Sequence, residues 1–363
     1  MKFKEGAIRE GQVTGLLNVL VFASIAAVAY ADWWVVAPIS LGYLYVLPIA
    51  LSGLVNRLPY SIVLAVVCTV LHDAFGRAVK PFSLRMDHDA IALAIFVIAA
   101  FVVTLLARER DRLFRQVRRQ RDEYEHDLAL AAQVQRKVLP PPPQVPGFEI
   151  AAAMRTARLL GGDYYDFFPL SADVIDIVIA DVSGKGAAAA LLMPSLAVAL
   201  RLRARELSGP AQVIRDFDQV LKQITNTATF VTMFYGRLHV ASKILQYANA
   251  GHNPPILMRA KTGERELLAD AGPILGILDG AQYHDVSVAL QPGDLLALYT
   301  DGVTEQEAPS GEEFSPERLA ELLREHAQEP ASSLAAEIPQ AVCSYAKTEE
   351  LADDLTVVIL KVT

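Results

Sequence analysis

Four short segments in the second half of the chain each place an aspartate beside a glycine or at the edge of an apolar run. They are GGDYYDFF (161–168), IVIADVSGKG (177–186), LLALYTDGVTE (295–305) and ADDLTVVILKV (352–362). Carboxylates collected at the ends of several strands suit hard, oxygen-binding cations such as Mg²⁺ and Mn²⁺. Two such cations a few ångströms apart can activate a shared water and hold a phosphoryl group for in-line attack. The pattern therefore predicts a two-metal site for phosphoryl chemistry.

Other chemistries fit these residues less well. The seven histidines show no paired ligand spacing, and the two cysteines, Cys68 and Cys343, are too few for a zinc site and too far apart for a disulfide framework. The SGKG segment lacks the first glycine of a phosphate-binding P-loop and has Gly186 where that loop has serine or threonine. The GGDYYDF segment has Tyr164-Tyr165 where the GGDEF signature of diguanylate cyclases is acidic. These sequence features therefore leave the two-metal interpretation in place.

The elements around the aspartates are expected to present them at turns. The apolar run that ends in Asp181 predicts a buried strand, and the glycines after it predict a tight turn into an alanine-rich helix. Two glycines before Asp163 allow the backbone to turn sharply and expose that carboxylate. Further predicted elements are helices at 187–207, at 210–226 and from Ser315-Pro316, and strands at 230–240 and 244–250.

Length and composition indicate more than one structural unit. The chain has 363 residues, and 53% of them are hydrophobic, with the apolar excess concentrated in the first 107. A net charge of −8 gives no electrostatic footprint for nucleic-acid binding, and two isolated cysteines fit a reducing compartment. We expect a transmembrane sensor or anchor region at 1–107, a helical connector at 108–139 and a catalytic domain at 140–363.

The first 107 residues are expected to form a transmembrane α-helical bundle of about four helices. A bilayer-spanning helix needs about 20 apolar residues. The four candidate stretches are 13–31, 35–55, 58–76 and 89–107. Because basic residues lie before the first stretch and directly after the fourth, the positive-inside rule puts both flanks in the cytoplasm. The prediction is a multi-pass protein of the cell (inner) membrane, in contact with membrane lipid, with a cytoplasmic catalytic domain.

A cleaved signal peptide is the competing interpretation of the N-terminus, since Ala29-Tyr30-Ala31 resembles a cleavage site. Glu5 and Glu10 in the n-region, and the three further apolar stretches, count against it.

The connector 108–139 has helical composition and an apolar seam at heptad-like spacing. The seam residues are Leu113, Val117, Tyr124, Ala131, Val134 and Val138. Gln120 and Asp127 interrupt the seam, so a coiled coil here would be short and imperfect. One interpretation is a homodimer that forms through the connector helix and transmits a signal; the other is a lone amphipathic helix that lies on the catalytic domain. The prolines from Pro140 onward end the helix and start a new domain.

Taken together and in this order, the four segments resemble the bacterial branch of the metal-dependent Ser/Thr phosphatases (the PPM, or type-2C, superfamily) that is named after sporulation stage II protein E. The resemblance covers about 135–363. It also takes in LALAAQVQRKVLP, FVTMFYGRL and YANAGHNPP. It implies an α+β fold, a four-layer α-β-β-α sandwich in which two antiparallel sheets pack face to face with helices outside each.

The resemblance also assigns the metal site residue by residue. Asp181 would bridge both cations, Mn²⁺ or Mg²⁺, and the Val182 carbonyl would bind one of them. Asp163 would complete one metal, while Asp301 and Asp353 would hold the other.

Three further residues have open assignments. Asp354 contributes less in the family than the aspartate before it. Asp166 either supports a ligand from behind or is a surface turn residue. His252, in the AGHNPP segment, is either structural or a proton donor.

The implied reaction is hydrolysis of phosphoserine or phosphothreonine by direct attack of water, without a covalent phosphoenzyme. The resemblance further implies that the substrate is a phosphorylated anti-sigma-factor antagonist, so that the protein would act in partner switching. One alternative is a catalytically inactive membrane scaffold that binds a phosphoprotein, although the intact acids argue against it. Another is a membrane sensor or transporter with an attached regulatory domain, but the apolar stretches show no ion pathway.

Overall fold

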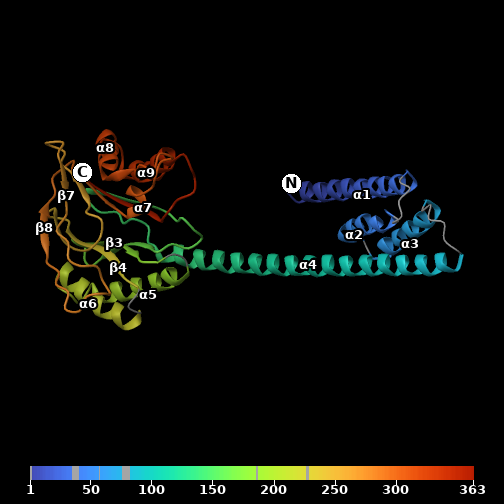
Figure 1. Ribbon diagram of the computed structural model, residues 1–363. Coiled ribbons are helices and arrows are strands. Elements are labelled where there is room, and N and C mark those ends of the chain that lie inside the picture. The colour runs from blue at the N-terminus through green and yellow to red at the C-terminus, as the bar shows by residue number, and fades with distance from the viewer. Residues whose placement is uncertain (1, 35–40, 57, 76–81, 185–186, 226–228) are drawn as a thin grey trace. The chain divides into compact units, whose positions relative to one another are not determined.

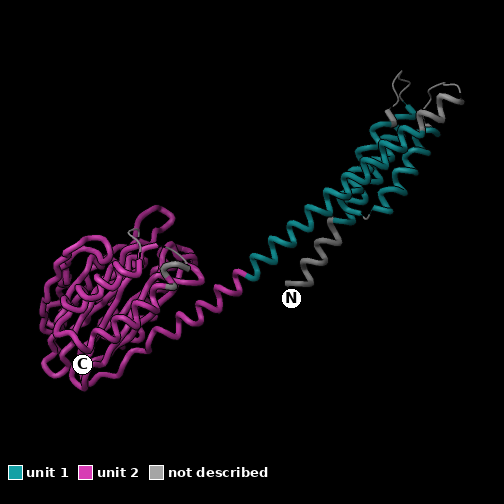
Figure 2. The backbone as a smooth tube through the Cα atoms, turned by 90° about the horizontal axis from the view of Figure 1, so that it is seen from below, with its two compact units in different colours: residues 1–123 teal, residues 124–363 magenta. Residues whose placement is uncertain are grey.

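The computed structural model describes residues 2–34, 41–56, 58–75, 82–184, 187–225 and 229–363, and it divides into two compact units, 1–123 and 124–363 (Figure 2). The division falls inside one helix, α4, which runs without a break from Phe82 to Val138. The fourth apolar stretch and nearly all of the predicted connector are therefore one continuous helix, which ends just before the proline run, as expected from its sequence.

The first unit is helical. Its elements are α1 (Lys2–Trp34), the short 3-10 helix η1 (Leu41–Tyr45), α2 (Val46–Val55), α3 (Leu58–Phe75) and the first part of α4. Val21 of α1, Ile49 of α2, Cys68 of α3 and Phe96 of α4 meet in a common apolar core. An N-terminal helical region is thus confirmed.

Two helical segments of this unit are long and apolar enough to cross a membrane, Thr14–Trp34 and Ala90–Val138. Two shorter apolar helices, Tyr43–Val55 and Leu58–Ala74, lie between them in the chain. These four segments overlap the four predicted stretches. Residues 35–40 of the second stretch and residue 76 of the third lie outside the described residues.

The second unit contains two antiparallel sheets of five strands each, and in both sheets the strand order brings distant parts of the chain together. One sheet has the order β1-β10-β9-β6-β7 and the other β2-β3-β4-β5-β8. The strands of the first are β1 (Phe148–Arg155), β10 (Leu355–Val362), β9 (Leu295–Tyr299), β6 (Ile256–Met258) and β7 (Arg265–Leu267). Those of the second are β2 (Asp163–Pro169), β3 (Val174–Val182), β4 (Val231–His239), β5 (Ile244–Ala250) and β8 (Val286–Ala289).

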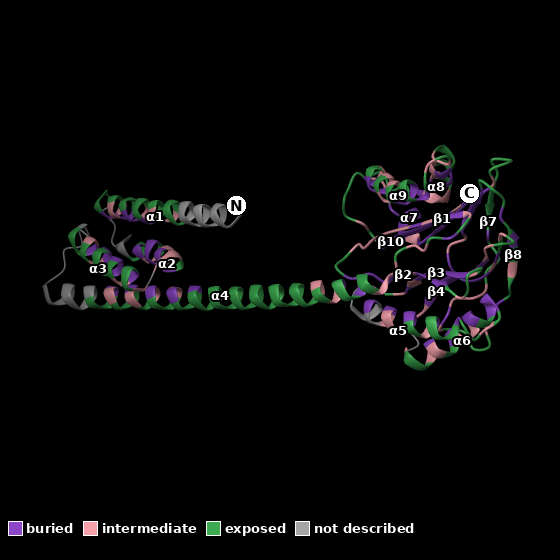
Figure 3. Cartoon of the chain, turned by 180° about the vertical axis from the view of Figure 1, so that it is seen from behind, coloured by how far each residue is buried: buried purple, intermediate pink, exposed green. Residues whose placement is uncertain are grey.

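Helices cover the outer face of each sheet (Figure 1). They are α5 (Ala187–Arg203) and α6 (Pro210–Ile224) on one side, and α8 (Ser315–Glu325) and α9 (Ala331–Ala346) on the other, with the single turn α7 (Asp301–Thr304) after β9. Strands β3, β9 and β10 are buried along nearly their whole length because they have a sheet on one face and helices on the other (Figure 3). The unit is therefore the expected pair of face-to-face sheets with helices outside.

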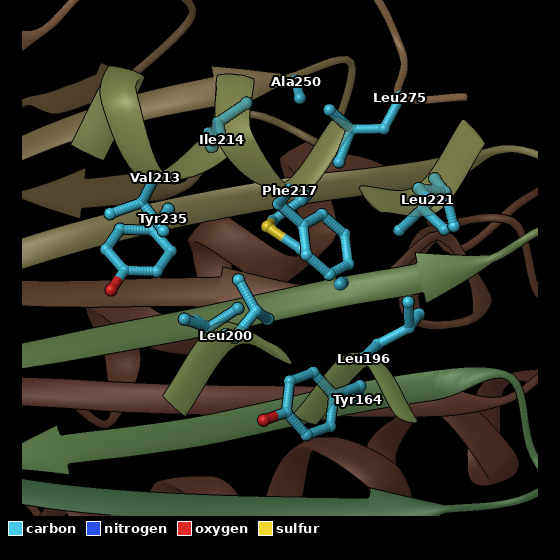
Figure 4. Close-up of a cluster of buried hydrophobic side chains, with 14 of the residues drawn as sticks. Tyr164, Leu196, Leu200, Val213, Ile214, Phe217, Leu221, Tyr235, Ala250 and Leu275 are labelled. Carbon is cyan, nitrogen blue, oxygen red and sulfur yellow. The ribbon is translucent and has the colours of Figure 1, made fainter. Parts of the chain in front are cut away.

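Three apolar cores hold these layers together. Between the sheets, Ile177 and Phe234 of one sheet pack with Leu298 of the other. Figure 4 shows the core under α5 and α6, where Leu200 and Phe217 pack with side chains of the sheet. The third core lies between the other sheet and α8 and α9. The predicted helices and strands after residue 187 are confirmed, with ends within about four residues of those expected.

Candidate metal centre

The site begins where β2 and β3 meet. The two strands pair antiparallel with Asp163 directly opposite Asp181. Directly opposite residues on an antiparallel pair have Cβ atoms about 5 Å apart. The pairing therefore places side by side the two aspartates that the sequence predicted as ligands of the same centre.

Asp163 is fully buried, and the hydrogen bonds that hold it come from the other sheet. Its Oδ2 accepts hydrogen bonds from Thr300 Oγ1 at 2.8 Å and from Thr356 Oγ1 at 2.6 Å. Thr300 follows β9, and Thr356 is the second residue of β10. Burial first, and then the charge of Asp181, raise the pKa of Asp163 well above its ordinary value, although the two threonine hydroxyls oppose this shift. A second charge beside this carboxylate is thus unfavourable unless a cation compensates it.

The other two predicted ligands lie at neighbouring strand ends. Asp301 follows β9, and Asp353 precedes β10, which pairs with β9. A Cβ on Gly302 would collide with the carbonyl oxygen of Asp354, so the Asp301-Gly302 turn lies directly against the segment that carries Asp353. Burial, followed by the charge of Asp301, raises the pKa of Glu305, and Asp353 contributes to the same shift. The structure therefore places Asp301 and Asp353 at the same edge of the sheet.

Asp354 has a structural task beside the site. Its Oδ1 accepts a hydrogen bond from the Ala157 N–H at 2.8 Å, and its Oδ2 accepts one from the Gly162 N–H at 2.6 Å. A Cβ on Gly161 would lie only 2.6 Å from the same Oδ2, so glycine is required for this close approach. Burial raises the pKa of Asp354 in spite of these backbone hydrogen bonds. The side chain thereby fixes the loop 156–162 that leads into Asp163.

The end of α4 holds the same loop from its other side. The Gln135 amide donates a hydrogen bond to the Gly161 carbonyl at 2.6 Å, and the Gly161 N–H donates one back to the Gln135 Oε1 at 3.3 Å. Ala132, one turn earlier, packs against Leu160 and Ala190. The last turns of the predicted connector are thus part of the phosphatase-like unit and directly support the glycine pair.

The donor set fits divalent cations that prefer oxygen ligands. Asp163, Asp181, Asp301 and Asp353 supply carboxylates only, which suits Mn²⁺ or Mg²⁺ better than zinc. Among the residues that the structure describes, these aspartates do not have ligand atoms all within 4.8 Å of one another. The type of the donor atoms, and not their spacing, therefore supports a divalent-cation site here.

Two other residues with open assignments are now placed. Asp166 is completely buried, where it accepts hydrogen bonds from Tyr164 and, at 2.8 Å, from Arg201. The interpretation of Asp166 as a surface turn residue is therefore wrong. His252 is also buried, with Nδ1 2.9 Å from the Thr232 hydroxyl, and burial lowers its pKa to about 4. Burial therefore favours the neutral ring, and the contact with the Thr232 hydroxyl fits the structural role.

The sequence interpretation missed the residues that hold the ligands in place. Thr300, Thr356 and Gln135 carry no charge and bind no expected ligand, so spacing alone did not single them out. A usable signal was position: Thr300 directly precedes Asp301, and Thr356 lies two residues after Asp354. Gln306, whose side chain accepts a hydrogen bond from the Ala352 N–H at 2.9 Å, was missed for the same reason.

Comparison with known proteins tests the resemblance stated from the four segments. The family model of stage II sporulation protein E (SpoIIE) matches residues 171–363. The phosphoserine phosphatase RsbU of Bacillus subtilis is 30% identical over 286 residues, which are 78% of this chain and 84% of RsbU. The resemblance stated from the four segments is thus confirmed.

Solved structures share the fold of the second unit. The SiaA-PP2C domain of Pseudomonas aeruginosa superposes with a TM-score of 0.58 at 23% identity, over 67% of this chain and 99% of that domain. The structure of the RsbU and RsbW domains of Rv1364c from Mycobacterium tuberculosis gives a TM-score of 0.52 at 28% identity, over 62% of this chain and 61% of that one.

Proposed function

Because the chain belongs to the stage II sporulation protein E family of metal-dependent Ser/Thr phosphatases, we propose that it is a membrane-anchored phosphoprotein phosphatase whose cations are held by Asp163, Asp181, Asp301 and Asp353. The observation that carries this proposal is the pairing of Asp163 with Asp181 in the sheet, together with the burial of Asp163. A buried carboxylate directly opposite a second carboxylate is an arrangement that a bound cation stabilises.

The chain's own residues would orient this site. Thr300 and Thr356 direct one oxygen of Asp163, which leaves its other oxygen for a metal. Asp181 would bridge the two cations, and the Val182 carbonyl would bind one of them. When bound, Mn²⁺ or Mg²⁺ lowers the pKa of water and neutralises charge on the phosphoryl oxygens. Because Asp163 lies in one sheet and its carboxylate is held by hydroxyls of the other, this ligand would need little reorganisation when substrate binds.

The proposed substrate is a protein that carries phosphoserine or phosphothreonine. RsbU, the relative that this chain covers almost completely, is named as a phosphoserine phosphatase. On the family resemblance of the four segments, we propose that this chain acts in a partner-switching pathway in the cytoplasm, where it would dephosphorylate an anti-sigma-factor antagonist.

Membrane anchoring through about four spans is supported by the surface of the first unit. Large apolar side chains face outward on each of its helices, including Phe22 of α1, Leu47 of α2, Val63 of α3 and Ile98 of α4. A protein in water does not normally expose apolar residues on every helix of a bundle, whereas lipid-facing helices do. The same helices also share an internal core, as a folded bundle in lipid would.

The connector supports a dimer over only part of its length. Leu113, Val117 and Tyr124 are exposed and lie on one face of α4, where they are available to a second copy. Ala131, in contrast, packs against the catalytic unit. The two interpretations of this helix therefore apply to different halves: we propose a homodimer through residues 113–124, while residues 128–138 lie on their own catalytic domain.

The decisive test is phosphatase activity of the full chain in lipid on a phosphoserine protein, with Mn²⁺, with Mg²⁺ and with a chelator. Activity is expected only with metal. Asp181→Ala should lower it roughly 100- to 1000-fold, the usual cost of removing one preorganised electrostatic group from an active site. Asp279→Asn, a change at an exposed acid on the same domain, is the matched control and should leave activity unchanged.

The scaffold alternative gives the opposite result. A catalytically inactive scaffold would bind the phosphoprotein equally well with the chelator or with Asp181→Ala, and it would release no phosphate under any condition. Release of phosphate that survives both treatments would exclude the two-metal proposal as well.

A further inference from the structure

The first turns of α4 beyond its apolar segment carry an unusual concentration of arginine. Residues 108–121 contain seven arginines and two acids, and the continuous apolar segment of the helix, with Leu105 and Leu106 exposed, ends just before them. All residues from 108 to 123 are exposed (Figure 3). Basic charge therefore starts where the continuous apolar segment stops.

Four of these arginines form a single stripe. Arg108, Arg112, Arg115 and Arg119 follow one another at steps of four, three and four, and they line one shallow groove along the helix. At 100° per residue they fall within an arc of about 60°. The exposed apolar residues of the proposed dimer seam, such as Val117, lie on the opposite side of the helix, so dimerisation would leave the stripe accessible.

Among the described residues, the stripe has no carboxylate paired to it, although Glu123 lines the far end of the same groove. Within the described part of the chain, the side chains of Arg108, Arg112 and Arg119 have no hydrogen bond or ion pair. Arg115 donates a hydrogen bond to the backbone carbonyl of Asp111, at 3.1 Å, and not to a carboxylate. An unpaired basic face of this kind attracts multivalent anions.

Its position along the helix identifies the anion. The stripe is about 16 Å long. Its first turn would lie at the level of the lipid headgroups. The other arginines would lie within about one headgroup layer plus one Debye length of that level, where the charge of the membrane surface still acts on them. The acids of the connector, four of them at 122–127, come only after the arginines and therefore farther from the apolar segment. This order of charge matches a negatively charged surface located at the end of the apolar segment.

We propose that the stripe Arg108, Arg112, Arg115 and Arg119 is a binding site for the headgroups of anionic phospholipids in the membrane that holds the chain. This rests on the proposed membrane anchoring but not on the proposed phosphatase activity. Each arginine near such a surface contributes a preference of about five-fold for anionic over neutral lipid.

The test uses the full chain in micelles that contain equal amounts of phosphatidylglycerol and phosphatidylcholine, with retained lipids counted by native mass spectrometry. The parent chain should retain phosphatidylglycerol at least about five-fold over phosphatidylcholine. The variant with Arg112→Gln, Arg115→Gln and Arg119→Gln should lower this preference by about five-fold for each arginine removed. Glutamine is a good helix former, so the helix should persist.

A matched control removes the same charge elsewhere. Arg205→Gln, Lys261→Gln and Arg324→Gln lie at exposed positions of the second unit and should keep the lipid preference of the parent. A parent without preference, or a stripe variant that keeps it, would overturn the inference. Displacement of the lipid by millimolar glycerol phosphate would also overturn it, because the site would then take soluble phosphate.

The inference and the proposed function can fail separately. Phosphate release measured on the same preparations tests the activity without reference to lipid. Extraction of membranes with alkaline carbonate tests anchoring: a chain that stays in the pellet but shows no lipid preference contradicts only the stripe.

Discussion

Two buried aspartates in neighbouring strands of one sheet are held in opposite ways. Asp176 of β3 receives two hydrogen bonds from Arg237, at 2.7 and 2.8 Å, and one from the Tyr235 hydroxyl. Asp163 of β2 receives only hydroxyl hydrogen bonds, and its nearest charged neighbours are further acids. A buried carboxylate that pairs with an arginine of the same chain belongs to the folded structure. A buried carboxylate that receives hydrogen bonds only from neutral groups indicates a site for an external cation.

The largest expected effect comes from neutralising the unbalanced aspartate. Asp163→Asn should lower phosphatase activity roughly 100- to 1000-fold, because a cation ligand is lost. The same variant of the compact unit 124–363, unfolded by urea without metal, should be at least as stable as the parent. The pKa of Asp163 is raised in the folded chain, so its ionised form opposes folding above the ordinary pKa, and asparagine removes that cost. A large fall in the free energy of unfolding measured without metal would contradict this comparison of Asp163 with Asp176.

Removing the basic partner of Asp176 should have the opposite effects, a large loss of stability and no change in metal dependence. Arg237→Ala leaves Asp176 buried without its partner, and the free energy of unfolding of 124–363 should fall by about 3–5 kcal/mol. The metal dependence of whatever folded fraction remains should be unchanged, as judged from the Mn²⁺ concentration for half-maximal activity. The replacement of both Asp176 and Arg237 by apolar residues should recover part of the lost stability, which separates the cost of an unpaired charge from that of a cavity.

The effect of burial on a pKa can also be tested at His252, a buried titratable residue that is not a carboxylate. Since burial lowers its pKa from 6.5 to about 4, the folded chain holds the neutral ring while the unfolded chain binds a proton. The contribution of His252 to the free energy of unfolding is therefore fully present above pH 6.5. It is lost as the pH falls toward 4, by about 3 kcal/mol in total. His252→Gln should flatten the pH dependence of urea unfolding over this range. The exposed His284→Gln is the control, and an equal flattening there would contradict the assignment.

The smallest effect is expected at Gln135, which supports the loop 156–162 before Asp163 but is not itself a predicted metal ligand. Gln135→Ala removes both hydrogen bonds to Gly161 and should weaken Mn²⁺ binding by about ten-fold, which is the cost of one or two hydrogen bonds. Calorimetric titration of 124–363 with Mn²⁺ measures it directly. Gln133→Ala, at an exposed position half a turn away, should have no effect.

The sequence predicted the acids better than it predicted what surrounds them. A single Asp-Gly turn is common, but four such segments in this order resemble one family, and that resemblance allowed Asp163, Asp181, Asp301 and Asp353 to be named in advance. Thr300 could not, because a neutral hydroxyl after a strand has many ordinary uses and its partner, Asp163, is more than a hundred residues away. Local spacing carries no information about contacts that only the packing of two sheets creates.

The helical half shows the same limit. Apolar length predicted the helices of residues 1–107, but the continuity of α4 from Phe82 to Val138 was not predicted, since composition changes abruptly at Arg108 while helix propensity does not. The division of the connector into an exposed and a packed half was likewise invisible, because both halves have the same heptad-like seam. Which seam residues meet their own domain depends on the tertiary structure.

Gly302 has a consequence for how relatives of this chain are classified. Any side chain at this position would collide with the Asp354 carbonyl, so the two acidic turns could not approach each other. A descendant gene could keep every carboxylate and still encode an inert protein after a single Gly302→Ala change. An inventory of acids alone would then assign an enzyme where none exists, and the glycine is the more informative residue for recognising lost catalysis in an inherited sequence.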